Sequence, residues 1–206
     1  MEAFVDAVLA IILTVIVLEL PQPGSISILG FWSLRTHFFA YLTSFVVVLT
    51  NWYFFHVIFS IVKSINGKVI GIVGGLLFVI SLLPYFTVLL SNNFGDFNAQ
   101  LTYCLFFIVV EITYDVLFNI LVRIENNVSL REILSFKRTF LHLVFYLVGI
   151  VVGFVYYPPV IVVFVFIVVL TWFVHVYRSI VGIDSSLWFF FNFFIKVTKS
   201  YLYKKI

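Results

Sequence analysis

The chain has 206 residues, of which 64% are hydrophobic and 10% are charged, whereas soluble domains carry about 25% charged residues. This composition excludes an ordinary soluble domain and indicates a protein whose solvent is lipid. The net charge of +3, without a basic and aromatic patch outside the apolar runs, argues against nucleic-acid binding.

The first apolar run, at about residues 3–20, starts almost at the initiator Met and carries Asp6 and Glu19 near its two ends. A signal peptide would have basic residues before this run and a small-residue cleavage site after it. The leader has Glu2 and Asp6 instead, and the following PQPGSISILG offers no such site. We therefore expect the segment to stay in the mature protein.

Five further apolar runs follow, each near the roughly 20 residues that a helix needs to cross a bilayer. The breakers SINGK, SNNFGDFN, RIENNVSLREILSFKR and YYPP separate them. The sequence predicts an all-α membrane protein with six transmembrane helices per subunit, within a channel domain at 1–182. The expected spans are about 3–20, 37–62, 68–91, 98–122, 138–156 and 159–178.

Basic residues set the orientation of these spans, because cytoplasmic loops are enriched in Lys and Arg. With six spans, one side collects eleven of the twelve basic residues, and only Arg35 falls opposite. We expect a multi-pass protein of the cell membrane with cytoplasmic N- and C-termini.

The apolar run in the tail at 183–206 is too short for a seventh span. Asn192, Lys196, Lys199 and Tyr203 recur at helical spacing as a polar stripe. This pattern favours an amphipathic helix in the inner interface over a frayed tail.

Two spans carry small residues at intervals of four, namely Gly67, Gly71 and Gly75 on the third and Gly149 and Gly153 on the fifth. This spacing lets helix backbones approach closely in lipid. Tight packing within one subunit is favoured over a subunit interface.

Acids inside a membrane cost free energy, so each needs a partner or a function. Asp6 lies at the same expected depth as Trp52 and His56, which are one turn apart on the second helix. We expect these three residues to form a structural network at the inner end, in preference to a proton relay. At the outer end, Glu19 either pairs with Arg35 and His37 or contributes to a ring of acids at an outer mouth.

Glu111, Asp115 and Asn119 follow each other at intervals of four on the inner half of the fourth helix. His142, His175 and Arg178 lie toward the same side. Buried hydrogen bonding is the favoured interpretation, and ion or proton handling by Glu111 and Asp115 is the alternative.

Catalytic and metal-binding patterns are missing from the sequence. It contains no Gly-x-Ser-x-Gly, His-Glu-x-x-His or phosphate-binding loop, and its single Cys104 lies in an apolar span. We expect neither an enzyme nor a cofactor or metal site.

The first helix has two distinct faces. Ile11, Thr14 and Leu18 share one stripe, and Asp6 points about 140° away from Ile11 at 100° per residue. If several copies of the helix surround a common axis, this stripe is free to face that axis.

Three segments carry a family resemblance. FVDAVLAIILTVIVLELP resembles the first-helix signature of the transmembrane protein 175 potassium channel family, in which Phe-Ser-Asp precedes a small residue, Ile and Thr; Val5 stands here in place of the Ser. AYLTSFVVVLTNWYFFHVIF is similar to the second-helix pattern of the family, and SLLPYF to part of its third helix.

The resemblance implies a bacterial-type, homotetrameric channel for monovalent cations, without a carbonyl filter loop. The first helix would line the pore, with Ile11 and Leu18 as aliphatic constriction rings and Thr14 as the polar lining residue between them. The expected function is a passive, leak-like potassium channel. The alternative is a proton-coupled secondary transporter that uses the acids of the fourth helix.

Overall fold

The computed structural model describes residues 1–61, 67–125 and 136–181, and in these ranges the chain forms α-helices and no strands. The tail predicted at 183–206 to be an interfacial helix lies outside the described residues. The helices are α1 (Glu2–Leu18), α2 (Ile28–Ser33), α3 (Arg35–Ile61), α4 (Gly67–Ser81), α5 (Leu83–Asn92), α6 (Phe97–Glu125), α8 (Phe136–Val155) and α9 (Val160–Val181).

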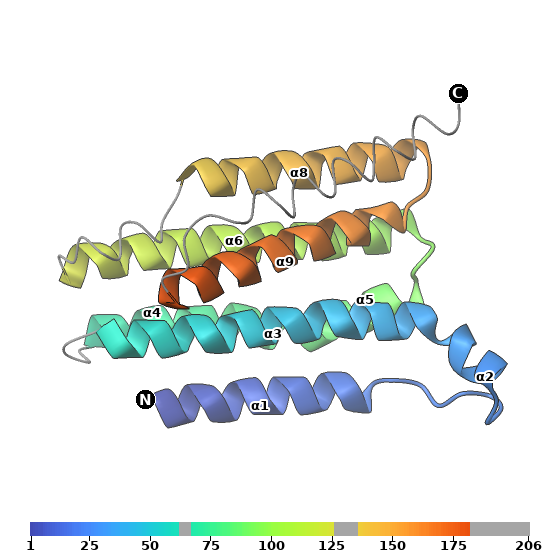
Figure 1. The fold of residues 1–206 in the computed structure, drawn as a ribbon, viewed down its shortest axis with the longest axis horizontal. Coiled ribbons are helices and arrows are strands. Elements are labelled where there is room, and N and C mark those ends of the chain that lie inside the picture. The colour runs from blue at the N-terminus through green and yellow to red at the C-terminus, as the bar shows by residue number, and fades with distance from the viewer. Residues whose placement is uncertain (62–66, 126–135, 182–206) are drawn as a thin grey trace.

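The long helices run roughly side by side, with α3 between α1 and α9 (Figure 1). Helix α1 packs against α3, α4 and α5, while α8 packs against α6 and α9. Helices α1 and α8 therefore lie on opposite sides of the bundle (Figure 1). The short α2 was not predicted, and it begins where the Ser27 side chain accepts a hydrogen bond from Gly30 N–H.

Four helical stretches in the described ranges are long and apolar enough to cross a membrane: Arg35–His56, Gly67–Asn92, Phe97–Ile120 and Arg138–Val155. They confirm a membrane protein with several spans. Helix α1 has 17 residues, and the apolar stretch of α9 at Val160–His175 is also shorter than these four. A total of six spans stays a prediction.

The expected third span is interrupted near its centre, where α4 ends at Ser81 and α5 starts at Leu83. Pro84 lies in the first turn of α5, a position that tolerates its missing N–H. Beyond this interruption, a buried hydroxyl cluster joins three helices, because Ser44 Oγ lies 2.7 Å from Thr87 Oγ1 and 3.2 Å from Tyr103 Oη.

The glycines of the two spans differ in their surroundings. A Cβ on Gly149 would lie 2.8 Å from Phe164, and one on Gly153 would collide with Ile161, so both glycines serve the close packing of α8 on α9. Gly67 and Gly71 instead face open space, with nothing within 4 Å of an added Cβ. The packing prediction is therefore confirmed for α8, whereas Gly67 and Gly71 do not support it within one subunit.

Candidate functional site

Helix α1 has one buried face and one exposed face. The buried residues Val5, Leu9, Ile12 and Ile16 recur at intervals of four and three, the spacing of one helix face. Ile11 is 61% exposed and Leu18 is 81% exposed, with Thr14 exposed between them. The stripe predicted from the sequence therefore lies on the part of α1 that the described helices of its own subunit leave uncovered, which also includes Phe4, Val15 and Val17.

Thr14 is the polar member of this stripe. Its hydroxyl donates to the Ile11 carbonyl oxygen at 2.7 Å, so its lone pairs stay available on the exposed face. Ile11 and Leu18 are seven residues apart, which at 1.5 Å per residue separates them by about 10 Å along the axis.

At the N-terminal end of α1, the acid that contacts His56 is Glu2. Its Oε1 lies 3.1 Å from His56 Nδ1, and the Trp52 ring stacks on His56 with centroids 6.0 Å apart. Asp6 is exposed and makes no hydrogen bond or ion pair with the described part of the subunit. At 100° per residue, Glu2 points about 60° from the buried Val5 and Asp6 about 100°, so Glu2 lies closer to α3.

Trp52 and His56 therefore come together as predicted, with a different acid. A role for Asp6 in a network between helices stays a prediction.

At the other end of α1, Glu19 caps the helix through its backbone, whose N–H bonds to the Val15 carbonyl oxygen at 3.2 Å. Its side chain is exposed and forms no ion pair with the described residues. Arg35 Nη1 donates to the Trp32 carbonyl oxygen at 3.2 Å. The expected pairing of Glu19 with Arg35 is thus not made within one subunit, and its place at an outer mouth stays a prediction.

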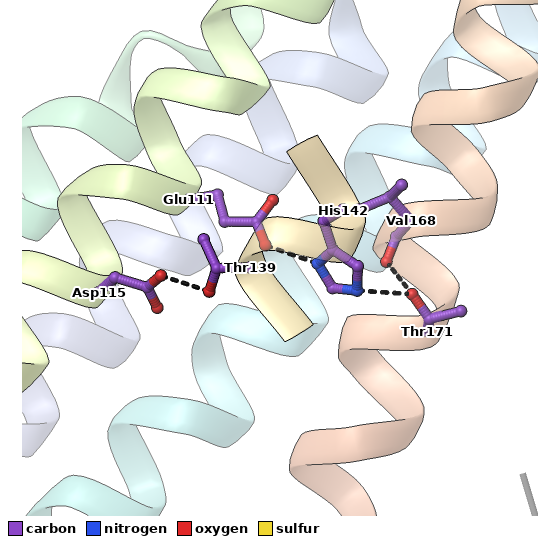
Figure 2. A network of polar contacts seen from close by, with 6 residues as sticks. All are labelled: Glu111, Asp115, Thr139, His142, Val168 and Thr171. Carbon is purple, nitrogen blue, oxygen red and sulfur yellow. Dashed lines mark hydrogen bonds and ion pairs between the residues drawn. The ribbon is translucent and has the colours of Figure 1, made fainter. Parts of the chain in front are cut away.

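The acids of α6 take part in a partly buried network that joins α6, α8 and α9 (Figure 2). Glu111 Oε1 lies 2.5 Å from His142 Nδ1, and His142 Nε2 lies 3.2 Å from Thr171 Oγ1. One turn along α6, the Thr139 hydroxyl donates to Asp115 Oδ2, and the Asn119 side-chain amide donates to the Asp115 carbonyl oxygen at 2.7 Å. Both acids thus have hydrogen-bond partners, as the favoured interpretation predicted.

The sequence indicated His142 as a partner of these acids but did not indicate Thr139 or Thr171. Thr139 lies three residues before His142 and therefore shares its helix face. That spacing was the available signal for Thr139. In the ranges 1–61, 67–125 and 136–181, no three His, Cys, Asp or Glu side chains are grouped so that they could hold a metal ion.

Comparisons with known proteins support the family resemblance of the first helices. The profile of the family described as endosomal/lysosomal potassium channel TMEM175 matches residues 1–84. A potassium channel of Chryseobacterium sp. (strain P1-3) is 35% identical over 174 residues, which cover 84% of this chain and 90% of that protein. The chain belongs to the TMEM175 potassium channel family.

A further relative and a solved structure extend the similarity, and the structure extends it to the fold. A potassium channel of Chamaesiphon minutus (strain ATCC 27169 / PCC 6605) is 36% identical over 97 residues, 44% of this chain and 48% of that protein. The crystal structure of a lysosomal potassium-selective channel TMEM175 homolog from Chamaesiphon minutus superposes with a TM-score of 0.69 at 26% identity. The match covers 87% of this chain and 96% of that chain, so the described bundle has a TMEM175-like fold.

Proposed function

We propose that this protein is a passive potassium-permeable channel in which several copies of α1 surround the pore. Ile11 and Leu18 form apolar constriction rings, and Thr14 lines the path between them. The observation that carries the proposal is the exposed stripe of α1, which the other helices of its subunit leave uncovered. Family membership supports ion conduction as the use of that stripe.

An apolar ring is a suitable constriction because a narrow oily pore holds water poorly and an ion even less well. Four copies of the chain, the assembly that the family resemblance implies, would place four Thr14 hydroxyls between two such rings. These hydroxyl oxygens would replace part of the hydration shell of a monovalent cation. Glu19, exposed at the end of α1, would contribute a ring of acids at the outer mouth.

The proposed topology has six spans formed by α1, α3, the α4–α5 pair, α6, α8 and α9. Helix α1, with 17 residues, is about 25 Å long at 1.5 Å per residue. That length is slightly less than the hydrocarbon core of about 30 Å, a mismatch that local thinning of the bilayer accommodates. With six spans, the basic residues place both termini in the cytoplasm of a cell-membrane protein.

The alternative, a proton-coupled transporter using Glu111 and Asp115, is not favoured. Both acids are hydrogen-bonded to α8, and α6 is not among the helices against which α1 packs closely. This placement suits a structural network between helices.

Ion flux from purified protein in liposomes tests the proposal. A potassium diffusion potential should drive flux without a proton gradient, and the flux should scale with protein content. Flux that requires a proton gradient, with none driven by voltage, would instead identify a coupled transporter.

A further inference from the structure

An open groove of about 830 Å³ lies beside α2 and the first two turns of α3. Seven of its nine lining residues are apolar, among them Trp32, Phe38 and Leu42, and the cationic member is Arg35. Trp32 is 66% exposed, and Phe38 and Leu42 are also exposed. The groove therefore combines an apolar wall with one basic group.

The position of the groove relative to the membrane follows from the spans. The membrane-spanning stretch of α3 begins at Arg35, so Arg35 and Trp32 lie at the boundary between hydrocarbon and headgroups. Phe38 and Leu42 lie three and seven residues further along α3, about 4.5 and 10 Å deeper at 1.5 Å per residue. Exposed Trp and Arg side chains are typical of the interface, and apolar side chains of the region below it.

Arg35 has capacity for a further anionic partner. One of its nitrogens donates to the Trp32 carbonyl oxygen at 3.2 Å, a bond that holds the guanidinium beside the groove. It forms no ion pair with an acid of the described chain. A guanidinium carries five N–H donors, so most of them remain for a ligand such as phosphate, which guanidinium binds in a bidentate manner.

We propose that this groove binds a phospholipid with an anionic headgroup. The phosphate would contact Arg35 at the membrane boundary, Trp32 would lie at headgroup level, and the upper part of an acyl chain would pack along Phe38 and Leu42. The inference depends on the membrane setting of α3 and not on which helix lines the pore.

Lipid retention by the purified full chain, measured by native mass spectrometry, tests the site. The probes are phosphatidylglycerol and phosphatidylcholine with identical acyl chains. The wild type should retain phosphatidylglycerol in preference to phosphatidylcholine. Arg35→Gln should lower phosphatidylglycerol retention about fivefold, the factor for about 1 kcal/mol per basic residue near an anionic headgroup.

Three variants separate this site from general effects. Arg35→Lys keeps the charge and should keep the preference for phosphatidylglycerol. Lys68→Gln removes one positive charge from the start of α4 and should lower phosphatidylglycerol retention less than Arg35→Gln does. Leu42→Trp fills the groove and should lower retention of both lipids. Equal effects of Arg35→Gln and Lys68→Gln would overturn the proposal. So would a Leu42→Trp protein that loses its assembly while retaining both lipids, because the groove would then be a contact between copies of the chain.

Discussion

At the scale of single residues, α1 carries two sets of apolar side chains: one set packs against other helices of the same subunit, and the other set does not. Val5, Leu9, Ile12 and Ile16 are buried, whereas Ile11 and Leu18 are exposed although they are equally apolar. Contiguous exposed apolar surface marks a site of contact with another protein, with lipid or with a ligand. The proposed function assigns this uncovered stripe to the surface that faces the pore.

Replacing Leu18 or Ile11 by Asn should raise potassium flux and weaken the preference for potassium over sodium, because a polar ring holds water where an apolar ring excludes it. The expected increase is about tenfold, which corresponds to a barrier lowered by about 1.4 kcal/mol. Potassium and sodium flux into liposomes, normalised to assembled protein, measures both effects.

Val17→Asn is the matched control. Val17 is 44% exposed, so the change does not disturb the buried face, and it points about 100° away from Leu18. Its flux should stay near that of the wild type. If the three Asn variants behave alike, the stripe does not line the pore.

The partly buried pair of Glu111 and His142 gives a second prediction at this scale. His142→Phe removes the hydrogen bond between His142 and Glu111 and should lower stability by about 1–3 kcal/mol, because a largely buried polar group loses one of its partners. Potassium flux per folded channel should change little, since the network joins α6, α8 and α9. Thermal unfolding in detergent and liposome flux measure the two quantities. Unchanged stability with abolished flux would support the transporter instead.

At the scale of elements, helix pairs differ in how closely their backbones approach. Helix α8 meets α9 at Gly149 and Gly153, where an added Cβ would collide with Phe164 or Ile161. Helix α4 instead presents Gly67 and Gly71 to open space within the subunit. The same sequence spacing therefore has two different structural settings.

Gly153→Ala and Gly71→Ala form a matched pair that distinguishes these settings. Gly153→Ala should destabilise the protein by about 1–3 kcal/mol through overpacking against Ile161. Gly71→Ala should be neutral or stabilising by up to about 1 kcal/mol, because Ala is the better helix former and nothing blocks its Cβ. Thermal unfolding of both variants is the measurement. Equal destabilisation would mean that α4 is also closely packed, against another copy of the chain.

At the scale of the whole molecule, the asymmetry of basic residues predicts that both ends of the chain lie in the cytoplasm. Eleven of twelve Lys and Arg fall on that side of the six-span topology, and such residues favour retention on the cytoplasmic side. Reporter fusions that are active only in the cytoplasm should therefore be active at both termini. Activity at one terminus alone would require an odd number of spans.

Much of this protein was determined by the sequence itself. Lipid offers no hydrogen bonds to the backbone, so each membrane segment must satisfy its own N–H and C=O groups as a helix. Apolar runs and their breakers therefore predicted the long helices. The motif in the first two helices indicated the family, and the α1 stripe followed from helical periodicity.

The tertiary structure decided which polar groups meet. Glu2 rather than Asp6 contacts His56, and Thr139 and Thr171 complete the network of Asp115 and Glu111. Each of these contacts depends on how far neighbouring helices are rotated about their axes. Glu2 and Asp6 are four residues apart and differ in direction by about 40°, so a rotation of α1 by that angle would exchange one acid for the other. Helical hydrogen bonds form within one segment, so sequence specifies them locally. Side-chain partners come from separate helices, so only the packing of the bundle selects them.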